Sequence, residues 1–455
     1  MTQTPMPSFP AGFRWGAATA AYQIEGGVNE GGRGASIWDT FSHEPDRIAD
    51  GSTGDVTCDH YHQYAADVAL MAELGLRAYR FSIAWPRIQP TGAGPANPEG
   101  LAFYDRLVDS LLSHGIEPAA TLYHWDLPQA LQDAGGWQNR DTAARFGEYA
   151  DAVATALGDR VKLWMTLNEP FIHYAVGHLL GIHAPGLNLY QSSFPVVHHM
   201  LLGHGLAVAA LRRHSSSPVA IANNYTPVWA TGPDGTRESA TDVDVAAAGV
   251  YDTFHNRLFT DPLLLGRYPD GVERLSTMDL DSIVLDGDLA VIGAPLDALG
   301  VNYYQPTAIS APEPDSPIPF SLQTVQGYPT TSFGWPVVPD GLRQLLTLLH
   351  ERYPNLPPIW VTENGCAYDD EPGPDRSIVD DKRITYLDGH IRALHAAMGA
   401  GVAVHGYCTW SMMDNWEWAE GFTKRFGLVH VDFPTLQRTP KASFAWYRDL
   451  IRQQP

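Results

Sequence analysis

Apolar and polar positions follow two different patterns along the chain. Short apolar runs recur from one end to the other, and longer stretches with apolar positions at helical spacing separate them. The runs predict eight buried strands, at residues 13–19, 78–85, 118–124, 162–168, 219–224, 298–303, 358–363 and 405–410. Continuous apolar runs of this kind are typical of a parallel sheet, because helices cover both of its faces.

The clearest helical stretches cover residues 59–74, 100–113, 142–156, 195–213 and 382–398. Alternating strands and helices predict an α/β fold, and eight such units predict a single (β/α)8 TIM barrel with its active site at the C-terminal ends of the strands. No Ser/Gly-rich linker or charge block divides the chain, so we expect one domain over residues 1–455. The longest irregular piece, residues 306–335, is expected to line the active-site mouth, with a solvated surface insertion as the alternative.

Two of the predicted strands end in a glutamate. Residues 166–170 are Thr-Leu-Asn-Glu-Pro and residues 362–365 are Thr-Glu-Asn-Gly, so Glu169 and Glu363 each lie where a strand gives way to a loop. Hydrolysis of a glycosidic bond needs one carboxylic acid to protonate the leaving oxygen and one carboxylate to attack or to activate water. The pair therefore predicts the acid/base and the nucleophile of a glycosidase.

The two glutamates need different surroundings. Glu363 has to stay ionised, which hydrogen bonds and a cation favour, whereas Glu169 has to stay protonated, which a drier place near a like charge favours. Arg80, on the second predicted strand, is the candidate cation beside Glu363, with a purely structural ion pair as its alternative role. Tyr303, at the end of the sixth strand, is the candidate donor of a hydrogen bond to Glu363.

Polar and aromatic residues near the other strand ends are candidates for substrate binding. The full set is Gln23, His124, Trp125, Asn168, Tyr303, Trp335, Trp410, Glu417 and Trp418. Polar members would bind sugar hydroxyls, and tryptophans would stack on the apolar face of a sugar ring. Taken alone, a residue such as His124 is more often structural, so the prediction depends on their occurring together at strand ends.

Charge and cysteine content narrow the function further. The chain has 29 Lys and Arg against 51 Asp and Glu, a formal net charge of -22, which repels nucleic-acid backbones and anionic lipid surfaces. We therefore expect neither a nucleic-acid nor a membrane partner. Cys58, Cys366 and Cys408 are too widely spread for a disulfide framework or a metal site, and the start of the chain lacks the pattern of a signal peptide. The expected compartment is the cytoplasm, and no metal or organic cofactor is expected.

The chain resembles glycoside hydrolase family 1, the retaining β-glycosidases, over almost its whole length. The resemblance is carried by both glutamate motifs and by residues 13–26, 123–128 and 414–418. It implies that Glu169 is the acid/base and Glu363 the nucleophile, and that Gln23, His124, Asn168, Glu417 and Trp418 grip the glycone. It also implies a two-step reaction through a glycosyl-enzyme intermediate, with retention of configuration.

The expected function is that of a β-glucosidase acting on small β-glucosides or cello-oligosaccharides, with some β-galactosidase or β-fucosidase activity. The main alternative is a 6-phospho-β-glycosidase, against which the carboxylate of Glu417 argues, although Lys424 lies near it in the sequence. A noncatalytic sugar-binding barrel is the alternative from another class, and the presence of both glutamates argues against it. The sequence does not decide between a monomer and a homo-oligomer.

Overall fold

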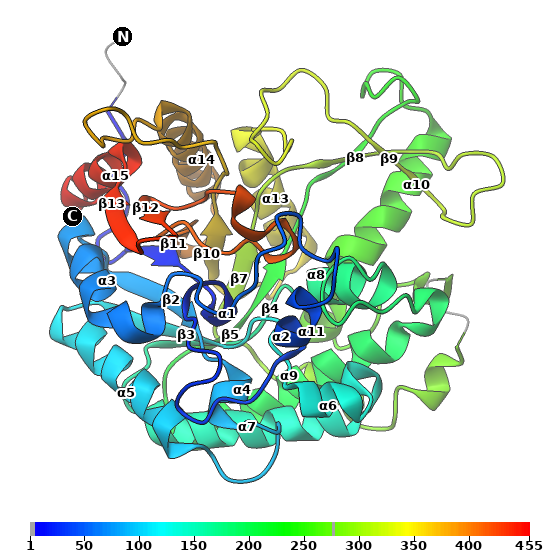
Figure 1. The fold of residues 1–455 in the computed structure, drawn as a ribbon. Coiled ribbons are helices and arrows are strands. Elements are labelled where there is room, and N and C mark those ends of the chain that lie inside the picture. Colours follow the sequence, from blue (N-terminus) through cyan, green and yellow to red (C-terminus); the bar gives the residue numbers. More distant parts are fainter. Residues whose placement is uncertain (1–4, 275–277) are drawn as a thin grey trace.

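The computed structural model describes residues 5–274 and 278–455, and its centre is a closed barrel of eight parallel strands (Figure 1). The strands follow each other around the barrel in the order β1-β11-β10-β7-β5-β4-β3-β2. Their bounds are Arg14–Ala18 (β1), Ala78–Ser82 (β2), Glu117–Tyr123 (β3), Leu163–Asn168 (β4), Val219–Asn224 (β5), Leu299–Asn302 (β7), Ile359–Asn364 (β10) and Val404–Trp410 (β11). The (β/α)8 fold predicted from the sequence is confirmed.

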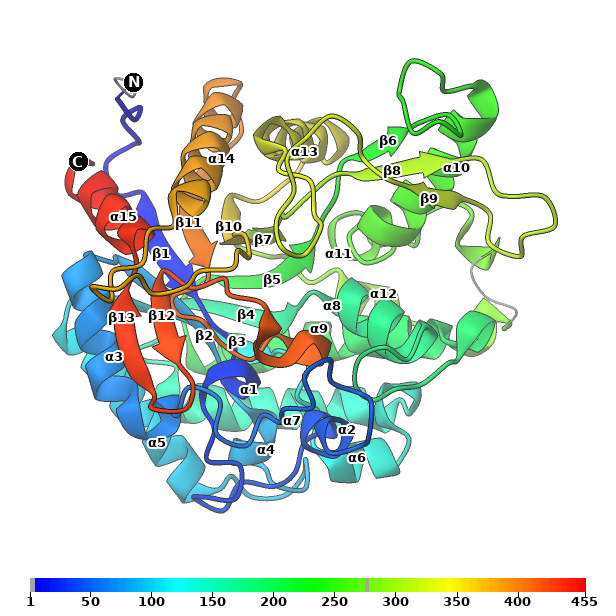
Figure 2. The ribbon, with the colours of Figure 1, turned by 45° about the horizontal axis from the view of Figure 1, so that its top comes forward.

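Helices form an outer layer around the barrel (Figures 1 and 2). The longer ones are α3 (His60–Leu74), α5 (Pro98–Ser113), α7 (Asp141–Leu157), α9 (Phe194–His214), α10 (Asp242–Asp252), α13 (Pro339–Arg352), α14 (Asp381–Gly399) and α15 (Ala442–Arg452). Shorter ones are α1 (Ala21–Ile24), α2 (Ile37–Ser42), α4 (Trp85–Ile88), α6 (Gln129–Asp133), α8 (Pro170–Ile172), α11 (Asp261–Leu265) and α12 (Asp288–Ile292). Each helix predicted from the sequence is present, with ends within two residues of the predicted ones.

Local sequence signals explain where the helices begin. The side chain of Asn97 accepts a hydrogen bond from the backbone N–H of Glu99 and so caps α5, whose first residue is Pro98.

Helix α9 lacks a side-chain cap and depends on packing instead. The stretch Tyr190–His214 is long and apolar enough to cross a membrane, yet 89% of its most apolar window is buried inside the protein. Its composition is that of a core helix.

Two small sheets extend the barrel at its loops. Strands β6 (Val228–Ala230), β8 (Thr307–Ser310) and β9 (Ser321–Gln323) form one of them, next to α10 at the upper right of Figure 2. Strands β12 (Val429–Asp432) and β13 (Gln437–Pro440) form an antiparallel hairpin. Residues 306–335, expected as irregular, therefore contain two strands, which anchor this excursion to the α10 region.

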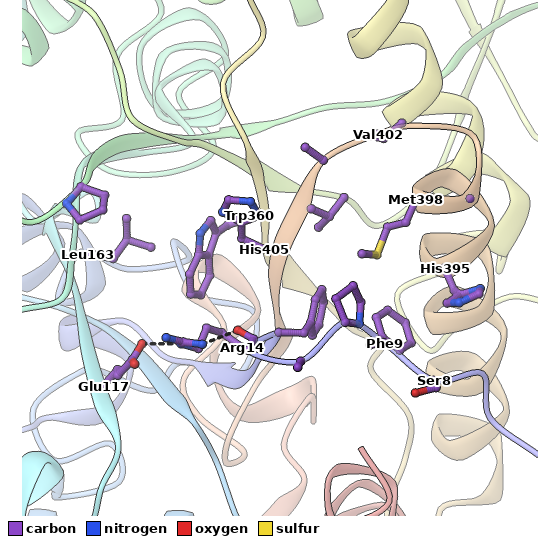
Figure 3. Close-up of a pocket in the computed structure, with 18 of the residues that line it drawn as sticks. Ser8, Phe9, Arg14, Glu117, Leu163, Trp360, His395, Met398, Val402 and His405 are labelled. Atoms are coloured by element: carbon purple, nitrogen blue, oxygen red, sulfur yellow. Dashed lines mark hydrogen bonds and ion pairs between the residues drawn. The ribbon is translucent and has the colours of Figure 1, made fainter. Parts of the chain in front are cut away.

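A cavity of about 950 Å³ lies at the amino-terminal ends of the strands, opposite the strand ends that carry the glutamates (Figure 3). The barrel interior nearby is lined by small side chains, among them Ala119, Ala220 and Ala298, against which Trp360 packs. The cavity wall holds one carboxylate, Glu117, whose Oε2 lies 2.7 Å from Nε of Arg14. A glycosidase needs two carboxyl groups, so this cavity does not supply the catalytic pair.

Candidate active site

Glu169 follows directly on the last residue of β4. Its backbone N–H still pairs with the carbonyl of Ala222 on β5, at 2.7 Å, and Pro170 begins the short helix α8. The backbone of Glu169 is left-handed, with φ of 42°, a conformation that costs a non-glycine residue about 1–3 kcal/mol. The turn directs the carboxyl group into the barrel mouth, where only 5% of the residue is exposed.

Glu363 lies on β10 and is surrounded by hydrogen-bond donors. Nη1 of Arg80 lies 2.5 Å from its Oε1, and the hydroxyl of Tyr304 donates to its Oε2 at 2.6 Å. Arg80 is fully buried and also donates from Nη2 to Oδ1 of Asn168, at 2.5 Å. These contacts place a buried guanidinium and a hydroxyl donor directly against the two carboxyl oxygens of Glu363.

The predicted hydrogen bond from Tyr303 to Glu363 is wrong. Tyr303 is buried, and its hydroxyl donates to the carbonyl of Val338 at 2.8 Å. Side chains alternate across a strand, and Asn302 points into the barrel, so Tyr303 points out to the helix layer and Tyr304 points inward again. The backbone N–H of Tyr303 donates to the carbonyl of Glu363 at 3.0 Å, but its hydroxyl bonds to neither catalytic carboxyl group, and the aromatic donor of the site is its neighbour Tyr304.

Glu169 lies in the opposite electrostatic environment. Its Oε1 accepts hydrogen bonds from Nδ2 of Asn302 at 2.7 Å and from Nδ2 of Asn224 at 3.4 Å, and no described cation forms an ion pair with it. Burial, followed by the nearby negative charge of Glu363, raises the pKa of Glu169 above its ordinary value. The site thus places two chemically identical groups in opposite surroundings, one beside a cation and the other away from one and near a like charge.

His124 and Asn168 have fixed orientations. Because an arginine can only donate, the contact with Arg80 identifies Oδ1 of Asn168 as the acceptor, and Nδ2 then donates to Nε2 of His124 at 2.9 Å. Burial lowers the pKa of His124, which keeps the ring neutral with its hydrogen on Nδ1. That Nδ1 is buried and has no hydrogen-bond partner among the described residues, so it is available to a sugar hydroxyl.

Gln23 and Glu417 form a second polar group in the mouth. Nε2 of Gln23 donates to Oε2 of Glu417 at 3.2 Å, while the buried Oε1 of Gln23 has no partner among the described residues. Burial, and then the charge of Glu363, raises the pKa of Glu417 to about 8. A carboxyl group in this state both donates and accepts hydrogen bonds, as recognition of a pair of sugar hydroxyls requires.

Four tryptophans complete the site. The ring centroids of Trp125 and Trp418 lie 4.6 Å apart. The ring of His124 stacks on both Trp418 and Trp410, with centroid distances of 5.7 and 5.9 Å. Trp335 is half-buried and lies 5.2 Å from the ring of Tyr304. Trp125 and Trp418 have φ of 75° and 51°, so together with Glu169 they place left-handed backbone at three points of the mouth.

Three side chains of the site, Asn224, Asn302 and Tyr304, lie outside the set expected from the sequence. Asn224 and Asn302 are the last residues of β5 and β7, so the strand-end rule that selects the other candidates also points to them. Among the described residues, no group of three or more His, Cys, Asp or Glu side chains is arranged to hold a metal. The chemistry available to this chain's own residues is proton transfer and nucleophilic attack by carboxyl groups.

Comparison with known proteins gives a consistent picture. Residues 6–455 match the sequence model of Glycosyl hydrolase family 1. The chain is 50% identical to thermostable beta-glucosidase B of Thermobispora bispora, over 98% of this chain and 91% of that protein. It is 43% identical to a bifunctional beta-D-glucosidase/beta-D-fucosidase of Bifidobacterium breve, over 97% and 98%. The structure of a Thermotoga maritima beta-glucosidase in complex with glucoimidazole superposes with a TM-score of 0.92 at 41% identity, covering 98% of this chain and 99% of that one.

Proposed function

The chain belongs to glycosyl hydrolase family 1, and we propose that it is a retaining β-glucosidase that releases terminal non-reducing β-D-glucosyl residues. The observation that carries this proposal is the opposite environment of the two glutamates. Arg80 and Tyr304 hold Glu363 as a carboxylate, while burial and that carboxylate hold Glu169 as an acid. Relatives at 41 to 50% identity carry the name beta-glucosidase.

The reaction then has two steps. In the first, Oε of Glu363 attacks the anomeric carbon while Glu169 donates its proton to the glycosidic oxygen, so the carbon–oxygen bond to the aglycone breaks and a glycosyl ester forms. Esterification removes the charge of Glu363, which lowers the pKa of Glu169 and turns it into a base. In the second step Glu169 takes a proton from water, the hydroxide oxygen attacks the anomeric carbon, and Glu363 leaves as a carboxylate.

We assign the glycone contacts to the polar atoms without partners. Nδ1 of His124 and Oε1 of Gln23 offer one donor and one acceptor to ring hydroxyls, and Glu417 offers both kinds of contact to a pair of hydroxyls. Asn168, next to Glu169, is assigned to the 2-hydroxyl, where a hydrogen bond strengthens in the transition state. Trp125, Trp335, Trp410 and Trp418 supply the apolar walls.

The surroundings of Glu417 argue against a 6-phosphorylated substrate. A phosphate needs cations, but Nζ of Lys424 lies 3.6 Å from the carboxylate of Glu420 and donates to the carbonyl of Ser332 at 3.3 Å. Its ammonium group also lies 5.2 Å from the ring of Phe333. Glu417 itself would repel a phosphate as soon as it ionised, so an unphosphorylated glycone fits the site better.

We further propose that short cello-oligosaccharides are substrates, that the enzyme takes part in cellulose degradation, and that it acts in the cytoplasm as a single-domain protein or a homo-oligomer. The kinship with a protein named as a glucosidase and fucosidase supports activity on β-fucosides as well. β-Galactosides and β-fucosides differ from β-glucosides only at positions 4 and 6 of the glycone. We therefore expect Glu417 to determine how well the enzyme discriminates among these substrates.

The test is hydrolysis of 4-nitrophenyl β-glucoside followed by NMR, with the 4-nitrophenyl β-galactoside, β-fucoside and β-glucoside 6-phosphate in parallel. The expected result is β-glucose as the first product and a higher kcat/KM for the glucoside than for its 6-phosphate. α-Glucose as the first product would contradict the retaining mechanism. Binding of glucoside without turnover would establish the noncatalytic alternative.

A further inference from the structure

A chain of hydrogen bonds leads from Glu169 outward to the helix layer. We propose that Asn224, His255 and Tyr251 are positioning residues, which fix the acid/base carboxyl group so that Oε2 carries the catalytic proton. The proposal rests on the proposed function, in which Glu169 is the acid/base. Asn224 ends β5, and the other two lie on α10 and the π-helical turn that continues it, Thr253–Arg257.

The contacts on Glu169 are one-sided. Both Asn302 and Asn224 donate from Nδ2 to the same oxygen, Oε1, at 2.7 and 3.4 Å. An oxygen that accepts two N–H groups is the carbonyl oxygen of the acid, so the proton resides on Oε2. No described side chain is hydrogen-bonded to Oε2, which leaves it available to the glycosidic oxygen. The longer contact is of the kind that tightens when substrate binds.

His255 sets the direction of the chain. Its Nε2 lies 2.8 Å from Oδ1 of Asn224, and its Nδ1 lies 3.2 Å from the hydroxyl of Tyr251. Because Nδ2 of Asn224 donates to Glu169, Oδ1 is an acceptor, so Nε2 of His255 carries the ring hydrogen and Nδ1 accepts from Tyr251. Burial lowers the pKa of His255 to about 3, so the ring keeps only this hydrogen. Every member therefore donates toward Glu169.

The same histidine also supports the backbone beside Glu169. Its ring centroid lies 4.1 Å from that of Phe171, two residues after Glu169, and both side chains are buried. At the outer end, the ring of Tyr251 lies 5.0 Å from Phe320, in the 306–335 excursion. The π-helical turn is thus linked to Glu169 in two ways. His255 is hydrogen-bonded to Asn224, which donates to Glu169, and its ring packs on Phe171 of α8, the helix that follows Glu169.

The chain positions a proton but does not conduct one. An asparagine amide stands in the middle of it, and an amide does not exchange a catalytic proton in the way that a carboxyl or imidazole group does. Nor is conduction needed, since Glu169 gives one proton in the first step and regains one in the second. Substitutions in the chain are therefore expected to slow only the steps in which Glu169 donates or accepts a proton.

The test compares two substrates that differ in their need for an acid. The leaving group of cellobiose is a sugar alcohol, which departs poorly unless its oxygen is protonated. The leaving group of 2,4-dinitrophenyl β-glucoside is a stable phenolate, which departs without protonation. Asn224→Ala and His255→Phe are expected to lower kcat/KM for cellobiose by about tenfold and for the dinitrophenyl glucoside by less than about twofold, on the scale of one hydrogen bond. His255→Gln, whose amide can still donate to Asn224, is expected to restore most of the cellobiose activity.

The pH profile provides a second measurement. The hydrogen bond from Asn224 lowers the pKa of Glu169, so Asn224→Ala is expected to move the basic limb of kcat/KM to higher pH. The charged and titratable groups facing Glu169, namely Glu363, Arg80 and Tyr304, are unchanged in this variant. An unmoved limb together with equal losses on both substrates would overturn the proposal.

His199→Phe is the matched control. His199 is also buried, on α9, and donates one hydrogen bond from Nδ1 to the carbonyl of Trp137 at 2.9 Å, away from both glutamates. Its replacement is expected to change kcat/KM for both substrates by the same factor.

Glu169→Ala separates failure of the proposed function from failure of the positioning chain. If this variant loses the same factor of kcat/KM on both substrates, the proposed role of Glu169 is wrong. If it discriminates and Asn224→Ala does not, only the positioning chain is wrong, and Asn224→Ala decides this even where His255→Phe does not fold.

Discussion

The barrel carries an arginine–glutamate ion pair at each end, and the two pairs lie in very different surroundings. At the carboxyl ends of the strands, Arg80 and Glu363 are 2.5 Å apart with side chains 0% and 4% exposed. At the amino ends, Arg14 and Glu117 are 2.7 Å apart with side chains 36% and 37% exposed, on the wall of the cavity in Figure 3. The residue types and the distances are nearly the same.

The difference shows that access to water, more than residue type, gives such a pair its role. Water screens the Arg14–Glu117 pair, so it is expected to contribute about 0–1 kcal/mol of stability. The Arg80–Glu363 pair has lost its hydration and depends on further donors, such as Tyr304, to keep the carboxylate ionised. In that dry place burial, and then this one fixed negative charge, raise the pKa of Glu169 and of Glu417.

The largest expected effect is that of Glu363→Gln. The substitution keeps the shape of the side chain but removes the attacking charge, so kcat on 4-nitrophenyl β-glucoside is expected to fall by at least about 10⁴-fold. It also leaves Arg80 as a buried unpaired charge, which is expected to lower the free energy of unfolding by about 3–5 kcal/mol. Urea denaturation and steady-state kinetics measure the two effects. A rate within tenfold of the native rate would place the nucleophile elsewhere.

Removing the cation is expected to have the next largest effect. Arg80→Met is expected to lower kcat by about 10²-fold, because the carboxylate of Glu363 loses its preorganised donor. Arg80→Lys is the matched variant: it keeps the charge but cannot contact both Glu363 and Asn168, so it should fall between the native enzyme and Arg80→Met. Equal kcat values for the native enzyme and Arg80→Met would show that the pair is only structural.

The pH dependence reports the second consequence of the buried charge. Glu169 must be protonated in the first step and its pKa is raised, so kcat/KM is expected to stay high through the range where an ordinary glutamate is ionised. Above the pKa of Glu169 it should fall about tenfold per pH unit. In Glu169→Gln, with 4-nitrophenyl β-glucoside as substrate, this basic limb should disappear. Its persistence there would assign it to another group.

A pair of adjacent tyrosines offers a sharper comparison. Tyr304→Phe removes a hydrogen bond to a charged group, which is worth about 1.5–3 kcal/mol, so kcat/KM is expected to fall by about 10- to 100-fold. Tyr303→Phe removes only the contact with the carbonyl of Val338 and is expected to lower stability by about 1 kcal/mol with kcat/KM unchanged. The reverse order of activities would restore the role that the sequence suggests for Tyr303.

The smallest expected effect is at the other end of the barrel. Arg14→Gln removes the half-exposed ion pair with Glu117, so the free energy of unfolding should change by less than about 1 kcal/mol and kcat/KM should not change. Parallel urea titrations of this variant and Arg80→Met measure the contrast between the two ends. A loss in Arg14→Gln as large as that in Arg80→Met would refute the contrast.

The tyrosines also show how far the sequence predicts the site. Hydrophobic patterning locates the strands, and the strand-end rule then brings Glu169 and Glu363 together correctly, because parallel strands share one edge. Arg80 lies in the middle of β2, and its long side chain reaches Glu363 from there. The direction of a side chain at a strand end depends on a shift of a single residue. Strand β7 ends at Asn302, and its pairing with β10 shifts register just before Glu363, so Tyr304 rather than Tyr303 reaches the carboxylate.

His255 shows a second limit on what can be predicted from the sequence. It lies on a π-helical turn far along the chain from either glutamate motif, and nothing in its local sequence indicates a contact with Asn224. The excursion at residues 306–335 is a similar case, since β8 and β9 form by pairing with β6 and with each other. Periodicity within one segment does not predict contacts that depend on the packing of distant segments.

The most direct test of the division of roles between the two glutamates is the product that Glu363→Gly forms from 2,4-dinitrophenyl β-glucoside in the presence of azide. With the nucleophile removed and Glu169 intact, azide is expected to enter the vacated space and restore turnover, giving α-glucosyl azide by NMR. β-Glucosyl azide, or a variant that hydrolyses the substrate at a near-native rate without azide, would contradict the assignment of Glu363 as the nucleophile.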